Sequence, residues 1–390
     1  MSEWKEYKLG EIANITPGFA FKSKDFGQTG ELVIKIKDIL PPYIDLKKAD
    51  YVDLANYDKN KLAKFLIHKN DYVIAMTGAT IGKVGKMKED KVAYLNQRVA
   101  KISAKEGICD GFVYYSICSD DFQLFIQNNI DSNSAQENIS ANSIGRFPIL
   151  LPSLDEQKRI ASILSSLDDK IDLLNRENAT LEAMAETLFR QWFIEEAKED
   201  WEEKPLGDVI KTTSGGTPSR KQTEYYNDGT INWVKSKELQ GTFISSTEEL
   251  ITEDAISNSS AKMLPVRSVL IAMYGATVGE YGILSKPMTC NQAVCALIPN
   301  ENYPYTYLFV WAALMKEDFI NLASGAAQQN ISQDLIKQQM VSSDINLIKL
   351  YDEQVRAYFE KMECNQRQIM LLSKQRDILL PKLMSNEISI

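Results

Sequence analysis

The chain has 390 residues, of which 44% are hydrophobic and 25% are charged, and its formal net charge is −9. These values are ordinary for a folded protein of two or three compact units, and they exclude a disordered chain, a collagen and a disulfide scaffold. No apolar run approaches the roughly 18 residues of a membrane helix, and five cysteines without a CxxC pair favour a reduced, cytoplasmic protein with no structural zinc site.

Residues 1–152 are predicted to form an α+β domain. Short β-like runs at 32–39, 71–75 and 92–95 are separated by Gly, Pro and Asn, and residues 111–128 have a helical pattern. Strands interspersed with helical segments favour the α+β class.

Residues 153–197 are predicted to form a long helix, because no Gly or Pro follows Pro152 in this stretch. Apolar residues recur there at spacings of four and three, which is a heptad seam. A helix from 155 to 193 would be about 58 Å long, so it needs a partner along its length. The seam residues are Leu164, Leu167, Ile171, Leu174, Asn178, Leu181 and Leu188. Asn178 is either a solvated edge residue or a polar residue that sets helix register.

The second half of the chain repeats the first. AMTGATIGKVG at 75–85 matches AMYGATVGEYG at 272–282, and AQENIS at 135–140 matches AQQNIS at 327–332. Paired Asn-Gln and Asp-Glu-Gln segments occur in the same order, which indicates a duplicated unit. We therefore predict a second α+β domain at 198–348.

Residues 349–390 are predicted to form a second long helix, which pairs with the first as an antiparallel coiled coil. Its seam residues are Met362, Ile369, Leu372 and Leu379. Asn365 and Arg376 interrupt this seam, and Pro381 is expected to bend or end the helix.

Several motifs resemble catalytic sequences without meeting their requirements. GATIGK at 78–83 has three residues between its glycines where a phosphate-binding loop has four, and Glu280 replaces its lysine in the second copy. Leu40 stands where the Pro-Pro-aromatic motif of adenine methyltransferases has Asp or Asn, and His68 is the only histidine. We therefore predict no catalytic residues, no metal site and no cofactor.

Two lysine pairs could form basic faces. Lys35 with Lys37, and Lys235 with Lys237, alternate on β-like runs, so each pair is expected on one face of a strand. On physical grounds alone, a solvated strand face is the favoured interpretation of both pairs. The acidic net charge argues mildly against generic nucleic-acid binding, which depends on neutralising phosphates.

As a whole, the sequence resembles the specificity subunit of a type I DNA restriction–modification system. The resemblance covers essentially the entire chain. It rests on two copies of W…LG, GAT[IV]G, Asn-Gln and AQ-x-NIS, each followed by a helix that begins near Asp-Glu-Gln. The segment SGGTPSRKQTEYYNDGTINWVKSKEL at 214–239 and the C-terminal LLPKLMSNEI are also similar to the family.

The resemblance implies a non-catalytic subunit in which each α+β domain reads one half of a bipartite double-stranded DNA target. The paired helices would space these domains and dock two adenine methyltransferase subunits, and motor–nuclease restriction subunits would join the complex. Such a subunit binds neither S-adenosylmethionine nor ATP. Half-sites read from one side of the duplex lie about 34 Å apart, within the length of the helix. The alternative is a protein-interaction scaffold without DNA readout.

The candidate DNA-binding residues are polar or basic. Asn and Gln can pair with adenine, and Arg and Lys with guanine. Because residues shared by both copies suit backbone contacts, the unshared loops are the better candidates for base reading. The shared candidates are Asn96, Gln97, Arg98, Gln136, Asn138, Asn291, Gln292, Gln328 and Asn330. The unshared candidates are Lys22, Lys24, Lys35, Lys37, Arg220, Lys221, Lys235 and Lys237.

Overall fold

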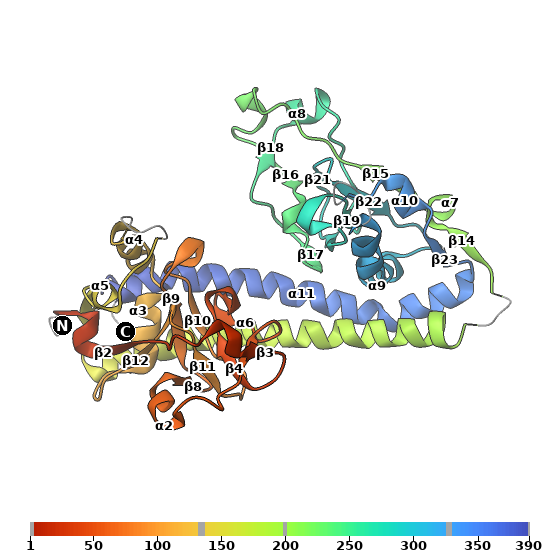
Figure 1. Cartoon of the computed structure of the whole chain (residues 1–390). Coiled ribbons are helices and arrows are strands. Elements are labelled where there is room, and N and C mark those ends of the chain that lie inside the picture. The colour runs from red at the N-terminus through yellow and green to blue at the C-terminus, as the bar shows by residue number, and fades with distance from the viewer. Residues whose placement is uncertain (1–3, 132–136, 198–200, 325–329, 389–390) are drawn as a thin grey trace. The chain divides into compact units, whose positions relative to one another are not determined.

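A computed structural model describes residues 4–131, 137–197, 201–324 and 330–388 (Figure 1). The described residues divide into two compact units. Unit 1 contains the chain up to Lys170 and again from Leu372, and unit 2 contains Ile171–Leu371. Each unit is α+β, as predicted, and includes parts of the two long helices α6 (Leu154–Arg190) and α11 (Ile345–Met384).

Unit 1 has a larger and a smaller β-sheet. The order of the larger sheet is β2 (Ala13–Pro17), β12 (Val99–Ala104), β9 (Tyr72–Ala75), β10 (Val84–Lys86), β6 (Tyr43–Ile44) and β5 (Ile39–Leu40). The order of the smaller sheet is β3 (Phe26–Gly27), β7 (Asp50–Val52), β4 (Glu31–Ile34), β11 (Ala93–Leu95) and β8 (Leu66–Ile67). A separate pair joins β1 (Lys5–Lys8) to β13 (Pro148–Leu151).

Strand β9 is apolar on both faces because both faces are covered. Tyr72 and Ile74 pack into one core with helices α3 (Asp110–Ile117) and α6, whereas Val73 and Ala75 pack into a second core against the smaller sheet. Successive side chains of a strand point to opposite faces, so the run YVIA serves two cores at once.

The helical patch predicted at 111–128 is two helices. These are α3 (Asp110–Ile117) and α4 (Asp120–Asn128). Ser119 separates them, because its hydroxyl accepts the backbone N–H of Phe122 at 3.3 Å and caps the second helix. The other short helices of unit 1 are α1 (Leu9–Ile12), α2 (Lys59–Leu62) and α5 (Ala141–Ile144).

Unit 2 repeats this architecture. Its larger sheet has the order β15 (Lys211–Ser214), β22 (Val294–Ile298), β19 (Val269–Ala272), β20 (Tyr281–Leu284) and β17 (Thr242–Ile244). Its smaller sheet has the order β18 (Leu250–Ile251), β16 (Ile231–Val234) and β21 (Thr289–Cys290), and β14 (Glu203–Pro205) pairs with β23 (Met340–Ser342). The helices are α7 (Leu206–Val209), α8 (Glu253–Ser257), α9 (Tyr305–Ser324) and α10 (Gln333–Lys337). The duplicated sequence therefore produces a duplicated sheet topology.

The GAT[IV]G motif is a turn in both units, as its tolerance of Glu280 predicts. It joins β9 to β10 in unit 1 and β19 to β20 in unit 2. Gly78 and Gly82 have φ values of 70° and 84°, and Gly275 and Gly279 have 68° and 81°. Such left-handed backbone favours glycine. The glycines of the motif therefore serve to form a turn, and the motif is not a phosphate-binding loop.

The first long helix agrees with the predicted range 155–193, since α6 is followed by a π-helical turn at Gln191–Glu195. The second begins at Ile345, four residues before the predicted start at 349. Asp344 accepts the backbone N–H of Leu347 at 3.0 Å and caps the helix, which then starts at Ile345. The expectation that Pro381 could end the helix is wrong: α11 continues to Met384, because Leu383 packs into the core of unit 1.

Within each unit, segments of α6 and α11 lie side by side (Figure 1). In unit 2, Asn178 on α6 contacts Asn365 on α11, and the carbonyl of Ala185 accepts a hydrogen bond from Tyr351 at 3.0 Å. The partner residue number falls as the α6 number rises, so the helices are antiparallel, as predicted. Among the described helices, none is long and apolar enough to span a membrane.

Candidate nucleic-acid interface

In each unit the repeated motifs meet just beyond the end of an inner strand of the larger sheet, β9 in unit 1 and β19 in unit 2. In unit 1, the N–H of Met76 donates to the carbonyl of Arg98, and the carbonyl of Met76 accepts from Ile139, both at 2.9 Å. In unit 2, Met273 makes the same two bonds with Ala293 and Ile331, at 2.8 and 2.9 Å. Segments far apart in the sequence are thus neighbours, and hydrogen bonds between their backbones explain why both copies retain them.

The shared Asn-Gln candidates form turns after β11 and β21. The side-chain oxygen of Asn96 accepts the N–H of Gln97 at 2.8 Å, and that of Asn291 accepts the N–H of Ala293 at 3.1 Å. The asparagines therefore stabilise their own turns. The neighbouring side chains of Gln97, Arg98 and Gln292 are exposed.

The remaining shared candidates lie beside the GAT[IV]G turn. Asn138 forms β-bridges with Thr77 and Asp131, and Asn330 forms one with Tyr274. Gln136 and Gln328 lie outside the described residues.

The expectation that each lysine pair lies on a strand is wrong. Strands β4 and β16 end at Ile34 and Val234, and a 3₁₀ turn follows each, at Ile36–Asp38 and Ser236–Glu238. The cause is local: the carboxylate of Asp38 accepts the N–H of Lys35 at 2.8 Å, and that of Glu238 accepts the N–H of Lys235 at 2.7 Å. These side-chain bonds compete with strand pairing.

In unit 1 the two lysine side chains nevertheless converge. The ammonium groups of Lys35 and Lys37 lie 2.9 and 3.0 Å from one carboxylate oxygen of Asp50, a residue of β7. Burial opposes ionisation of Asp50, but the hydrogen bonds from the two lysines lower its pKa overall. Lys35 also lies over the Phe26 ring, 3.7 Å from its centroid.

Asp38 gives unit 1 a pH-dependent stability. Burial raises the pKa of this carboxyl from 3.8 to about 6, against the hydrogen bond from Lys35. Its stabilising contribution is therefore complete below pH 4 and is lost as the pH rises through 6. The wild type should lose about 1 kcal/mol of unfolding free energy between pH 5 and pH 7 as Asp38 ionises. Asp38→Asn has no such carboxyl and should not show this loss. Urea unfolding at both pH values tests this, and parallel pH profiles would contradict it.

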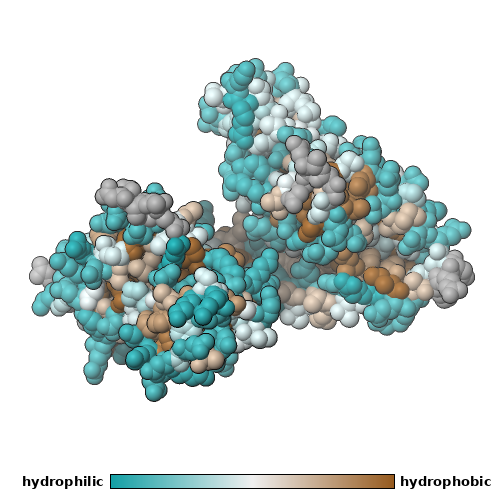
Figure 2. Space-filling view, viewed as in Figure 1, coloured by the Kyte–Doolittle hydropathy of each residue, from teal (hydrophilic) through white to brown (hydrophobic). Residues whose placement is uncertain are grey.

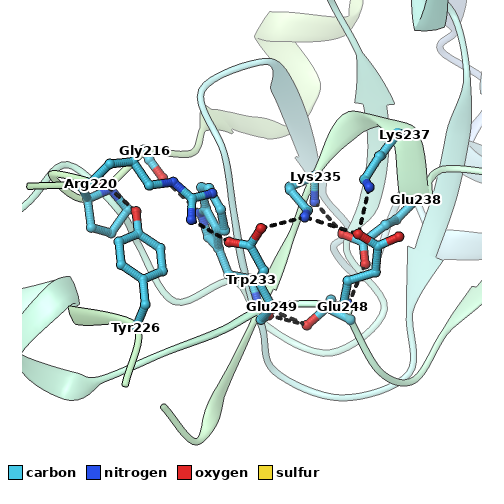
Figure 3. Close-up of polar contacts among 11 residues, drawn as sticks. Gly216, Arg220, Tyr226, Trp233, Lys235, Lys237, Glu238, Glu248 and Glu249 are labelled. Atoms are coloured by element: carbon cyan, nitrogen blue, oxygen red, sulfur yellow. Dashed lines mark hydrogen bonds and ion pairs between the residues drawn. The ribbon is translucent and has the colours of Figure 1, made fainter. Parts of the chain in front are cut away.

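In unit 2 three cations share two carboxylates (Figure 3). Arg220 lies 2.7 Å from Glu249, and Lys235 lies 2.8 Å from Glu249 and 3.1 Å from Glu248. Lys237 lies 2.6 Å from Glu248. Hydrogen bonds from Arg220 and Lys235 lower the pKa of Glu249, and those from Lys237 and Lys235 lower the pKa of Glu248. Both carboxylates are therefore charged at neutral pH.

Arg220 is held against two aromatic rings. Its guanidinium lies 4.3 Å from the ring centroid of Tyr226 and 5.1 Å from that of Trp233. The Tyr226 hydroxyl donates to the carbonyl of Pro218 at 2.7 Å, and the Trp233 indole N–H donates to that of Gly216 at 3.0 Å. The loop that carries Arg220 is thereby fastened to β16.

The other basic candidates are exposed. Lys22 and Lys24 flank Ser23 at a 3₁₀ turn of unit 1, and Lys221 follows Arg220 in unit 2. Hydrophilic side chains cover much of the surface of unit 2 around α8 and β18 (Figure 2). Within the described ranges, no group of His, Cys, Asp and Glu could hold a metal ion.

The predicted seam residues of the long helices are buried or half-buried. Leu164, Leu174 and Met362 are buried; Leu167, Ile171, Leu181, Leu188, Ile369, Leu372 and Leu379 are half-buried. Asn178 accepts a hydrogen bond from the amide nitrogen of Asn365 at 2.9 Å, and Asn365 is fully buried. Of the two interpretations of Asn178, the structure therefore favours an inter-helix polar contact over a solvated edge.

Sequence reasoning missed the polar contacts that fasten each unit to its helices. In unit 1, Asp168 accepts hydrogen bonds from Tyr115 at 2.8 Å and from Arg376 at 2.9 Å. In unit 2, Arg267 lies 2.8 Å from Glu363. The sequence contains one signal for the contact in unit 1: Arg376 interrupts the apolar seam of α11, and Asp168 lies near the seam of α6.

Comparisons with known proteins agree with this architecture. The family model described as "Type I restriction modification DNA specificity domain" matches residues 1–183 and 198–354. The MjaIX specificity subunit of a type I restriction enzyme from Methanocaldococcus jannaschii is 24% identical, over 100% of this chain and 97% of its own length. The HindI specificity subunit from Haemophilus influenzae is also 24% identical, over 100% of both chains.

A solved structure shows the same fold. The S subunit of a type I restriction–modification system from M. genitalium aligns with a TM-score of 0.59 and 15% sequence identity, over 98% of this chain and 96% of that chain. The family model covers most of the present sequence, in two matches that correspond to its two repeats. The chain therefore belongs to the family of type I restriction–modification DNA specificity subunits.

Proposed function

We propose that this specificity subunit reads a bipartite, asymmetric DNA target, one half with each α+β domain. The domains would comprise residues 1–152 and 198–348, and the helical segments 153–197 and 349–390 would space them and dock two adenine methyltransferase subunits. Restriction subunits would join through the resulting complex. In this proposal the chain carries no catalytic group and binds no cofactor.

One observation carries the proposal: the two units share a backbone fold but have different side chains around the turn that follows β4 in unit 1 and β16 in unit 2. Both units present a lysine pair on a 3₁₀ turn after the first long strand of the smaller sheet. Unit 2 adds Arg220, stacked on two aromatic rings, whereas unit 1 places Lys35 on Phe26. Because base edges are distinguished by the donors and acceptors that face them, different side chains on one framework would select different half-sites.

The long helices offer apolar surface for the methyltransferases. In unit 2, Leu173 and Met184 of α6 and Leu371 of α11 are 49%, 47% and 64% exposed. Large exposed apolar side chains on helices whose seam is already occupied are typical of protein interfaces. This supports docking of a protein partner along the helices.

The experiment that tests the function is co-expression with a candidate methyltransferase subunit, sought among the reading frames next to this gene. The mass of the purified complex and methylation-sensitive sequencing of the host DNA would be measured. We expect two methyltransferases per chain and modified adenines in a single split, asymmetric motif. A monomeric chain and the absence of any split motif would instead support the scaffold alternative.

Within this function, the double variant Arg220→Ala with Lys221→Ala should bind the target duplex about 10- to 100-fold more weakly in the methylating complex. The loss of one guanidinium that pairs with a base or phosphate costs about 1–3 kcal/mol, and the second cation adds to it. Affinity is measured by titration at physiological salt.

Two further variants sharpen this test. Lys286→Ala with Lys204→Ala removes the same charge from exposed positions of unit 2 and should leave affinity nearly unchanged. Arg220→Lys keeps the charge but loses the planar guanidinium, so a loss confined to the cognate sequence would identify Arg220 as a base-reading residue. Equal affinities of the first double variant and the wild type would refute its assignment.

A further inference from the structure

Three of the cations that the proposed function assigns to DNA in unit 2 are already paired with carboxylates. Arg220, Lys235 and Lys237 each lie within 2.8 Å of a carboxylate oxygen of Glu248 or Glu249. A phosphate that approached these cations would meet two negative charges at the same place (Figure 3). Such an arrangement weakens the attraction for any duplex, whatever its sequence.

The carboxylates are positioned by the fold. One oxygen of Glu238 accepts the N–H of Lys235 at 2.7 Å, and the other accepts the N–H of Glu248 at 2.8 Å. A single side chain therefore ties the lysine turn to the acidic segment. The backbone carbonyl of Glu249 accepts the N–H of Trp233 at 3.3 Å, which holds the segment against β16.

Unit 1 has the same arrangement built from different residues. Asp38 occupies the position on the turn that Glu238 has in unit 2. Asp50 of β7 forms ion pairs with both Lys35 and Lys37. In each unit the acid comes from the segment that pairs with the strand before the turn. The loops that carry these residues are otherwise dissimilar, so the recurrence of the counter-charge points to a shared requirement.

Fold stability does not account for Glu248. The side chain of Glu248 is 57% exposed and that of Lys237 is 59% exposed. Exposed ion pairs of this kind contribute little to stability, because solvent screens them and both long side chains lose conformational freedom. Their effect on an approaching polyanion is larger, since every duplex carries phosphates.

We propose that Glu248 and Glu249 are counter-charges that suppress binding to non-target DNA, an inference that rests on the proposed function of this surface. On arbitrary sequence the cations stay paired with the carboxylates, and the net attraction to phosphate is small. On the target, base edges accept hydrogen bonds from the same cations and offset the lost ion pairs. The counter-charges therefore raise the ratio of specific to non-specific affinity.

The test is Glu248→Gln in the full chain assembled with its methyltransferase. The probes are a random-sequence duplex of about 40 base pairs and a duplex of equal length that carries the methylated motif. Removing one counter-charge exposes one more cation to phosphate. We expect the affinity for the random duplex to rise about tenfold at 0.1 M salt, and the slope of log affinity against log salt to steepen by about 1. The specificity ratio should fall.

Glu301→Gln is the matched control, because it changes the net charge equally at an exposed residue of the loop between β22 and α9. If Glu248→Gln and Glu301→Gln bind the random duplex alike, the inference is overturned.

Lys235→Ala with Lys237→Ala separates the two possible failures. If this double variant weakens binding while Glu248→Gln has no effect, only the counter-charge inference fails. If the double variant also leaves both duplexes bound as in the wild type, the proposed DNA-binding function of this surface fails with it.

Discussion

Leu174→Asp should unpair the two long helices and, under the proposed function, release the methyltransferases that dock on them. Leu174 lies on α6 with 1% of its surface exposed, one turn before Asn178, which contacts α11. Residues four apart share a helix face, so the new carboxylate would lie in the helix interface. Loss of a buried leucine together with burial of an unpaired charge should reduce the free energy of unfolding by about 4 kcal/mol or more.

Urea unfolding and co-purification with the methyltransferase measure the two effects of Leu174→Asp. Asn175→Asp adds the same charge at the adjacent exposed position and should change neither stability nor assembly. Leu173→Asp alters an exposed residue of the proposed docking surface, so it should weaken assembly while stability is retained. A Leu174→Asp chain that assembled normally would show that the seam has been assigned incorrectly.

Arg267→Ala should destabilise unit 2 by about 3–5 kcal/mol. Arg267 lies in the turn before β19, and its guanidinium lies 2.8 Å from the carboxylate of Glu363 on α11. The Glu363 side chain is only 9% exposed, so removal of Arg267 leaves a buried charge whose remaining cation, Arg367, lies 4.0 Å away. The guanidinium also lies over the rings of Phe243 and Tyr305, at 5.4 and 5.0 Å, and these contacts would be lost too.

A double variant separates the ion pair from simple truncation. Arg267→Met with Glu363→Met removes both charges and fills the space with apolar atoms, so it should recover most of the lost stability. Arg267 has a φ of 70°, and Arg267→Gly should therefore be about 1 kcal/mol less harmful than Arg267→Ala. Urea unfolding of the full chain measures all three variants. A loss below 1 kcal/mol in Arg267→Ala would contradict a structural role for this ion pair.

The fold could be predicted where the information is local or repeated. The heptad spacing of α6 predicted a helix whose start and end agree closely with the structure, because each turn of a helix depends on neighbouring residues. The second helix was placed too late because its start was inferred from the first copy, whereas Asp344 caps it earlier in the chain. Alternation predicted a strand at Lys35 and Lys37, but hydrogen bonding by Asp38 ends that strand before the first lysine.

The amino-acid sequence by itself determined the duplication, the α+β class, the paired helices and the family, because repeats and periodic patterns are read along the chain. Only the tertiary structure decided which charges meet. Glu248 and Glu249 reach Lys235 across two paired segments, and Arg376 reaches Asp168 across two helices. No sequence pattern predicts either contact, because the partners are far apart in the chain and an ion pair depends on their distance in the folded structure. The same lysines therefore look like free cations in the sequence and are paired ones in the folded protein.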